Sequence, residues 1–162
     1  VRALNPLQVL PGTAVSITVD RQPSTVVGGE AFGTQPRLSV RDSWGNLAWM
    51  VEHNISAQLA PWSLGQGGHL CPGACPETRE EQRVAETKLG VATFTALAID
   101  VVGSCYVILF TAPSLYSATS VPLNVEPGPP FQLLIREQPD GALPGYALSD
   151  QPVVCLCDRG GN

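Results

Sequence analysis

Short runs of alternating apolar and polar residues divide this chain into candidate strands. The runs at 15–19 and 38–41 alternate cleanly, and apolar side chains at every second position predict strands that bury one face. Further strands are predicted at residues 48–51, 55–59, 91–97, 105–110 and 121–125. The residues of the first two runs that we expect to face the core are Val15, Ile17, Val19, Leu38 and Val40.

Gly and Pro punctuate these runs and indicate the fold class. The 16 glycines and 15 prolines separate short segments rich in Val, Ile, Thr and Leu, a pattern typical of an all-β sandwich. No stretch carries a sustained helical stripe. The best candidate, residues 76–88, contains good helix formers but no apolar face, so we expect at most a short exposed turn of helix there.

The last 46 residues of the chain repeat its first 46 at an offset of 116 positions. Residues 11–46 align with residues 127–162 without a gap, with 11 identical positions, and Pro6, Leu7 and Val9 raise the total to 14 of 46. An internal period of this length indicates a tandem array of domains. We therefore predict the last strand of a preceding repeat at 1–10, a complete repeat at 11–126, and the first strands of a following, truncated repeat at 127–162.

The second copy keeps the apolar pattern of the first. Cys155 and Cys157 fall on the other face of their strand, which places them toward solvent or a neighbouring repeat. Because the remaining strands of this copy lie beyond Asn162, we expect its stability to depend on strands from the rest of the chain. The apolar counterparts of the core positions are Phe131, Leu133, Ile135, Val154 and Leu156.

An Asp followed by Gly-Asn closes a tight turn in both copies. Asp42 and Asn46 recur as Asp158 and Asn162, and an Asp that accepts nearby backbone N–H groups ahead of Gly-Asn is typical of a turn. The connection between the copies, residues 127–130, reads Pro-Gly-Pro-Pro. We expect this connection to be short and stiff, so that adjacent repeats hold a limited range of angles.

Metal binding is the alternative interpretation at two places. The two turns of Asp followed by Gly-Asn, together with Asp20 and Asp100 near strand ends, are candidates for binding Ca²⁺. Ca²⁺ requires six to eight oxygen ligands, however, and each turn offers only two side chains. His69, Cys71 and Cys75 offer one imidazole and two thiols, whereas structural zinc requires four ligands. We therefore expect neither a metal nor a cofactor.

Cysteines and a glycosylation motif favour an oxidising compartment. Asn54-Ile55-Ser56 is an N-glycosylation motif, and its acceptor would be Asn54. Cys71 and Cys75 lie in an insertion at 65–83, and we expect them to bond each other, or one of them to bond Cys105. These features favour an extracellular or cell-surface location reached through the secretory pathway. The disulfide candidates are Cys71, Cys75, Cys105, Cys155 and Cys157.

Composition argues against several classes of partner. The net charge is −5, only 14% of the residues are charged, and Lys and Arg form no cluster. This balance argues against nucleic acid or an anionic membrane surface as the main partner. No apolar run approaches the roughly 20 residues needed to span a bilayer, so we expect no membrane insertion in this segment.

Groups able to carry out catalysis are scarce. Only His53 and His69 could serve as a base for a nucleophile, and no Gly-x-Ser-x-Gly motif is present, so we do not expect an enzyme. Trp44 at a turn tip and Trp62 at the start of the insertion are candidates for loop contacts with a protein or glycan. The alternative is that such an aromatic side chain folds back and covers the end of the sandwich.

The order of motifs resembles a known repeat type. Gln22-Pro23, Gly29 to Phe32, Gln35 to Asn46, Gly90 to Ile99 and Gly103 to Tyr106 together are similar to the tandem immunoglobulin-like repeats of large cell-surface and secreted proteins, of the filamin-like and bacterial Ig-like type. The resemblance implies an Ig-like β-sandwich of about seven strands, used as a spacer or adhesive unit. The insertion at 65–83 departs from this pattern, because many such repeats have a short hairpin there.

Taken together, the sequence predicts a structural module of a large extracellular or cell-surface glycoprotein. Its expected role is that of a stalk, spacer or fibre-forming unit whose partners are neighbouring repeats or further copies of itself. One alternative is an adhesion or recognition module that binds a protein or glycan through its loops. Another is a domain appended to an enzyme elsewhere in a longer chain.

Overall fold

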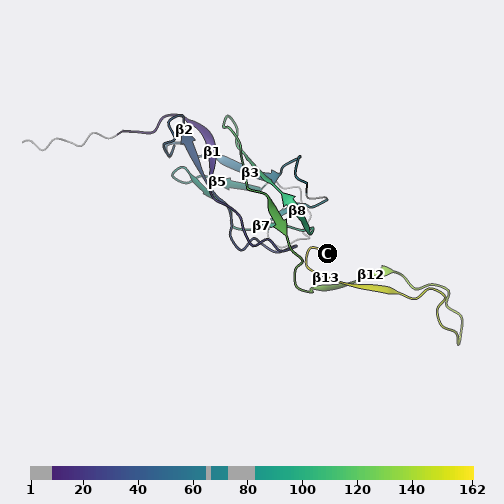
Figure 1. The fold of residues 1–162 in the computed structure, drawn as a ribbon. Coiled ribbons are helices and arrows are strands. Elements are labelled where there is room, and N and C mark those ends of the chain that lie inside the picture. Colours follow the sequence, from purple (N-terminus) through teal and green to yellow (C-terminus); the bar gives the residue numbers. More distant parts are fainter. Residues whose placement is uncertain (1–8, 65–66, 73–82) are drawn as a thin grey trace, which may run out of the picture.

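The computed structural model describes residues 9–64, 67–72 and 83–162, and it is built from β-strands (Figure 1). Most strands belong to one sandwich. A two-stranded hairpin projects from one end of it, and the beginning of the described chain lies at the other end (Figure 1). No helix in the described part of the chain is long and apolar enough to cross a membrane.

Two antiparallel sheets form the sandwich. The first has the order β1-β2-β6, and the second has the order β10-β9-β3-β5. The second order is that of strands G, F, C and C′ in immunoglobulin domains. The strands of the first sheet are β1 (Ala14–Arg21), β2 (Arg37–Asp42) and β6 (Val91–Thr93), and those of the second are β10 (Ala118–Thr119), β9 (Ile108–Thr111), β3 (Asn54–Leu59) and β5 (Arg83–Glu86).

Two short pairs extend the sandwich toward the hairpin. β11 (Leu123–Val125) pairs with β8 (Gly103–Tyr106), and β4 (Leu70–Pro72) pairs with β7 (Leu97–Ile99). The segments β6 and β7, β8 and β9, and β10 and β11 follow one another after short interruptions. Counted as single interrupted strands, they give the described part of the sandwich seven strands besides β4, with the hairpin not included. The predicted all-β, Ig-like sandwich is confirmed.

The core lies between the two sheets and is complete within residues 17–125. Leu38 and Val40 of β2 are fully buried, as is Phe110 of β9, whose ring packs against Phe94 with centroids 5.7 Å apart. Ile17 and Val19 also contact the core, as expected. Val15 is only half-buried and is not a member of the core cluster, because an irregularity in the β1–β2 register between Ala14 and Ser16 interrupts the alternation.

Two predicted strands differ from the structure. Residues 48–51 form no strand, because β2 already has β1 on one edge and β6 on the other, and the residues after Ala48 leave the sheet. The predicted strand 91–97 is interrupted between β6 and β7. Just after the interruption, at the first residue of β7, the Gln35 side chain accepts the Leu97 N–H at 2.9 Å and donates to the Leu97 carbonyl at 3.0 Å.

The predicted helical turn lies mostly outside the described residues. Of the range 76–88, the structure describes residues 83–88, and Arg83–Glu86 form strand β5 at the edge of the second sheet. Residue pairs such as Ile55 and Ala85 place β5 beside β3. In this part of the range, an available sheet edge therefore outweighs a weak helical preference.

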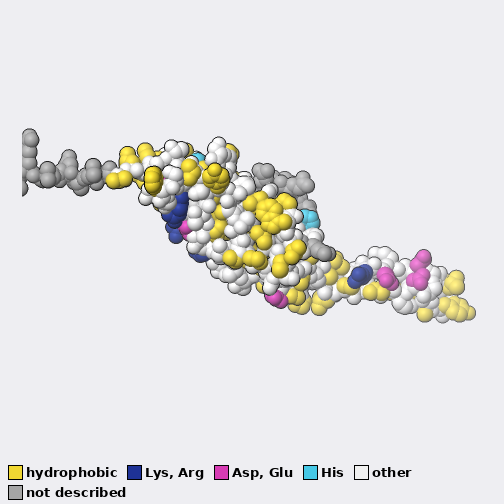
Figure 2. Space-filling view, turned by 45° about the horizontal axis from the view of Figure 1, so that its top comes forward, with side chains coloured by type: hydrophobic (Ala, Val, Ile, Leu, Met, Phe, Trp, Pro, Cys, Tyr) yellow, Lys and Arg dark blue, Asp and Glu magenta, His cyan; other side chains and the backbone are white. Residues whose placement is uncertain are grey.

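The hairpin consists of β12 (Gln132–Glu137) and β13 (Val153–Cys157). Leu133 pairs with Leu156 and Ile135 with Val154, in the same register as Ile17 with Val40 and Val19 with Leu38. The apolar side chains of the hairpin remain exposed, with Leu133 at 69% and Leu156 at 63%, and hydrophobic groups are visible along it (Figure 2). Only the base of the hairpin, where it meets the sandwich, is buried.

Candidate functional site at the joint of sandwich and hairpin

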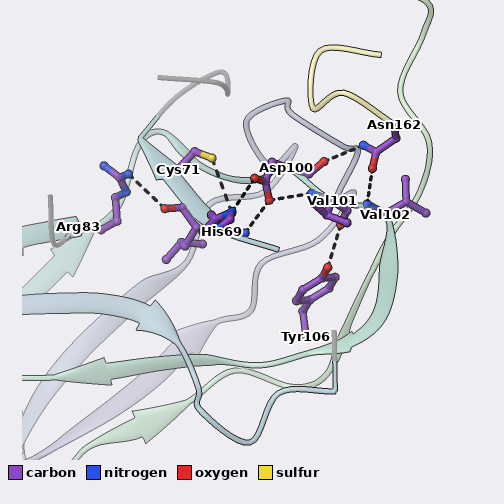
Figure 3. A network of polar contacts seen from close by, with 9 residues as sticks. His69, Cys71, Arg83, Asp100, Val101, Val102, Tyr106 and Asn162 are labelled. Carbon is purple, nitrogen blue, oxygen red and sulfur yellow. Dashed lines mark hydrogen bonds and ion pairs between the residues drawn. The ribbon is translucent and has the colours of Figure 1, made fainter. Parts of the chain in front are cut away.

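The hairpin is held against the sandwich by its terminal loop, residues 158–162. The Asn162 side chain donates to the Asp100 carbonyl oxygen at 2.7 Å, and its Oδ1 accepts the Val102 N–H at 2.8 Å (Figure 3). A single amide thus bridges two backbone groups of the sandwich. We call these contacts the joint, which consists of residues 158–162 on one side and Gly28, Gly29, Asp100 and Val102 on the other.

The backbone at residues 100–102 is fixed before Asn162 binds to it. The Asp100 carboxylate accepts the His69 N–H at 2.6 Å and the Val101 N–H at 2.8 Å, and it contacts the His69 Nδ1 at 3.0 Å (Figure 3). The Tyr106 hydroxyl donates to the Val101 carbonyl at 3.0 Å. These bonds hold the loop between β7 and β8 in one conformation, so its two partners for Asn162 are preorganised.

Tyr106 occupies the position of the tyrosine corner of immunoglobulin-type sandwiches. Its ring is fully buried at the last residue of β8, and its hydroxyl bonds to the backbone five residues upstream. Burial raises the pKa of Tyr106, and the nearby negative charge of Asp100 raises it further. The hydroxyl therefore keeps its proton and remains a donor to Val101 at neutral pH.

Glycines allow the two sides of the joint to approach closely. Gly29 has a φ of 75°, and a Cβ at this position would lie closer than 3 Å to the Gly160 nitrogen. A Cβ at Gly160 would lie equally close to the Asp100 carbonyl oxygen. Real Cβ atoms essentially never make such contacts, so no other residue fits at either position without moving the hairpin.

Asp158 organises the hairpin side of the joint. Its carboxylate accepts the Gly128 N–H at 2.8 Å and the Asn162 N–H at 2.9 Å, and the Asn162 side chain bonds to both of its oxygens. Burial alone would raise the pKa of Asp158, but the N–H donors of Gly128 and Asn162 outweigh it and the pKa is lowered. A charged Asp158 therefore ties the connecting segment, the turn and Asn162 into one unit.

The first copy makes the same bonds at the opposite end of the sandwich. Asp42 accepts the Gly12 N–H and the Asn46 N–H, both at 2.8 Å, and also the Trp44 N–H at 2.9 Å. The Gly12 N–H contributes most to lowering the pKa of Asp42 from 3.8 to about 2; burial opposes this, and the Asn46 and Trp44 donors add to it. These N–H donors around the carboxylate fit the turn interpretation of the sequence.

Replacing Asp42 with Asn should reduce the acid sensitivity of the sandwich. The pKa of Asp42 is lower in the folded chain than its ordinary value of 3.8, so its contribution to stability is full above about pH 4 and is lost as the pH falls toward 2. We expect the difference in Tm between wild type and Asp42→Asn to be largest near pH 6 and to narrow between pH 4 and pH 2. Thermal unfolding followed by circular dichroism measures it, and a constant difference across this range would contradict the assignment.

The structure does not gather the predicted contact residues into one site. Trp44 precedes β3 and Trp62 follows it, so they lie at opposite ends of the sandwich, and both are exposed. Asn54 is exposed at the first position of β3, which leaves its side chain accessible to glycosylation. Glycosylation at Asn54 stays a prediction.

The cysteines are also dispersed. Cys71 lies in β4 and is disulfide-bonded, while Cys105, Cys155 and Cys157 carry free thiols. Cys75 lies outside the described residues, so the pairing within the insertion stays a prediction, as do partners for Cys155 and Cys157 elsewhere. Among residues 9–64, 67–72 and 83–162, no group of three or more His, Cys, Asp or Glu side chains is placed to hold a metal ion.

Sequence reasoning identified one side of the joint and missed the other. The Asp158 to Asn162 turn was predicted as a turn, without a binding partner. Gly28, Asp100 and Val102 carry no local motif that indicates their role, and they are more than 50 positions away from Asn162. The recurrence of Gly-Asn in both copies was the sequence signal that could have indicated a binding role for Asn162, because a turn alone does not require Asn at this position.

Comparisons with known proteins give distant likenesses. Two solved structures of glycosyl hydrolase family 2 members, both from Bacteroides cellulosilyticus, resemble this chain with TM-scores of 0.44 and 0.41 and sequence identities of 15% and 17%. The alignments cover 72% and 67% of this chain but only 15% of each of those chains. No protein-family model and no curated protein matches the sequence.

Proposed function

We propose that this chain is a structural segment of a tandem array of Ig-like sandwiches, in which the joint sets the angle between successive units. The observation that carries this proposal is the bidentate contact of Asn162 with Asp100 and Val102. A flexible tether would need no such contact. A chain that must keep its direction over many units needs a rigid connection, and the joint supplies it.

The hairpin supports the proposal because it has the features of the beginning of a second sandwich. Its strand register and its Asp158 bonds recur at the same offset as the sequence repeat. Gln151 donates to the Leu148 carbonyl at 2.9 Å, as Gln35 does to Phe32 at 3.2 Å. Gln35 also bonds Leu97, whereas the described residues contain no such partner for Gln151. The open apolar face and the spare amide of Gln151 both fit further strands of a second sandwich.

The proposed setting is a large extracellular or cell-surface glycoprotein, without enzymatic activity in this segment. Support comes from the exposed Asn54 of the glycosylation motif and from a polar network at the joint that is occupied by structural bonds. The proposed partners are neighbouring units of the same chain and, in a fibre, further copies of it. No nucleic acid, membrane insertion or cofactor forms part of this proposal.

Replacing Asn162 with Ala tests the joint directly. We expect the Val102 amide to exchange with solvent roughly fivefold faster, because a hydrogen bond of this kind contributes about 1 kcal/mol. The hairpin should then tumble more independently of the sandwich in ¹⁵N relaxation measurements. Asn46→Ala is the matched control, since Asn46 makes the corresponding bonds within its own turn and, among the described residues, bonds to no second unit. An equal effect of both variants, or an unchanged Val102 amide, would contradict a role in joining units.

A recognition module is the second candidate, and the exposure of Trp44 and Trp62 favours it. Because these side chains lie at opposite ends of the sandwich, one compact ligand would engage only one of them. A recognition role would therefore involve one loop at a time. Loss of specific binding to a protein or glycan after replacement of a single Trp would support it over a purely structural role.

A further inference from the structure

Trp44 is the largest exposed side chain on an otherwise rigid turn. It is 86% exposed, although its own N–H and those of Gly12 and Asn46 are bonded to Asp42. Trp is enriched at the centres of interfaces, where it supplies much of the binding energy. The position of Trp44 in the repeat indicates which surface it faces.

The counterpart of Trp44 is Gly160, which lies against the base of the sandwich. The chain enters both turns in the same way, because Gly12 donates to Asp42 and Gly128 donates to Asp158, each at 2.8 Å. The sandwich that precedes Gly128 lies against the Gly160 turn. By the same arrangement, the chain that precedes Gly12 leads to the Trp44 turn. Whatever folded unit precedes Gly12 should lie against Trp44.

The residues before Gly12 have the pattern of a final sandwich strand. Leu7 and Val9 align with Leu123 and Val125 of β11, which are 6% and 2% exposed. Val9 itself is 83% exposed. An apolar residue of this pattern needs a core that the described residues do not provide at this end of the chain.

We propose that Trp44 inserts into the base of a preceding sandwich of the same kind and fixes a joint that differs from the one at Asn162. This inference rests on the proposed function, because it assumes that units follow one another. The base formed by Gly28, Gly29 and Asp100 cannot accept a Trp, since even a Cβ at the corresponding Gly160 lies too close to the Asp100 carbonyl. The preceding base must instead offer an open apolar pocket.

The pocket needs to hold one indole and its apolar surroundings. Trp buries roughly 150–250 Å² when it is enclosed. Trp49 and Met50 follow the turn in sequence and are 41% and 58% exposed, so exposed apolar side chains continue along the chain after Trp44. Two units joined in this way would be held mainly by apolar contact, whereas the joint at Asn162 is held by backbone hydrogen bonds. The two ends of this sandwich would thus be held to their neighbours by different kinds of contact.

Hydroxyl-radical oxidation followed by mass spectrometry tests the inference in the intact protein. We expect Trp44 to lose most of its oxidation in the intact protein compared with the 162-residue chain, in which it is exposed. Trp62, at the other end of the sandwich, is the internal control and should react equally in both. A Trp44→Gly variant should keep the fold, because the second copy has Gly at this position, and it should loosen the connection to the preceding unit.

Three outcomes overturn the inference, and they are distinguishable. If the residues before Gly12 form a folded sandwich, shown by slow amide exchange at Leu7 and Val9, while Trp44 reacts equally in both proteins, the Trp44 contact is wrong and the proposed array stands. If no sandwich precedes Gly12 and Leu7 and Val9 exchange freely, the contact and the proposed array both fail. Protection of Trp44 by a separate protein, with no preceding sandwich, would likewise refute the inference.

Discussion

Replacing Gly160 with Trp is expected to detach the hairpin from the sandwich. The variant gives the second turn the residue that the first turn has at Trp44. A side chain at this position would meet the Asp100 carbonyl oxygen at less than 3 Å, and backbone atoms there cannot move aside because Asp100, Val101 and Tyr106 are bonded to one another. Forcing extra atoms into a packed contact costs typically about 1–3 kcal/mol. The two bonds of Asn162 contribute about 1 kcal/mol each, so the joint should open rather than accommodate the Trp.

Residual dipolar couplings and ¹⁵N relaxation measure this change. In wild type we expect the couplings of β12 and β13 to fit the same alignment tensor as those of the sandwich. In Gly160→Trp they should require a separate tensor, and the Val102 amide should lose its protection from exchange. The sandwich should remain folded, because its core is complete within residues 17–125. Leu143→Trp, which introduces the same side chain at an exposed site in the loop between β12 and β13, is the control. A single tensor for Gly160→Trp would contradict the assigned close approach.

The fold was predictable from sequence because its main signals are local. Alternation at Leu38 and Val40 identified a buried strand, and both residues are fully buried. The errors have a common cause, which is competition between segments distant in sequence. Residues 48–51 have strand composition, but both edges of β2 are occupied by β1 and β6. The interruption of 91–97 ends at Leu97, whose backbone is bonded by the side chain of Gln35, 62 positions away.

The joint was only half predictable for a related reason. The Asp158 turn follows from five consecutive residues, and the bonds between Asp158 and Asn162 are those that the residue types imply. The other side is made by a carbonyl oxygen and an N–H, which every residue except Pro carries. These two groups can bind Asn162 because His69 and Tyr106 hold the backbone in place. No sequence pattern at Asp100 or Val102 indicates this. The requirement for glycine at Gly29 and Gly160 likewise comes from the close contact between the hairpin and the sandwich, which the local sequence does not show.

Introducing Asp at Val40 should unfold the sandwich, whereas Asp at Leu156 should have little effect in this chain. Val40 is fully buried at the centre of the core, and an unpaired carboxylate there costs several kcal/mol, a large part of the roughly 5–15 kcal/mol that stabilises a domain. Leu156 is the counterpart of Val40 and is 63% exposed. A substitution at such a site typically changes the free energy of unfolding by less than about 0.5 kcal/mol. Circular dichroism and urea unfolding of both variants measure the difference.

The same pair of variants in the intact protein tests whether the hairpin begins a second sandwich. If further strands cover β12 and β13, Leu156 becomes a core residue, and Leu156→Asp should then unfold that unit as Val40→Asp unfolds the first. Leu133 and Ile135 would be buried with it, as Ile17 is buried and Val19 partly buried between β1 and the second sheet. In urea unfolding of the intact protein, Val40→Asp should remove the cooperative transition of the first sandwich. Leu156→Asp should remove that of the second. If Leu156→Asp remains without effect in the intact protein, the exposed face of the hairpin is not the beginning of a core, and the repeat in sequence does not correspond to a repeat of folded units.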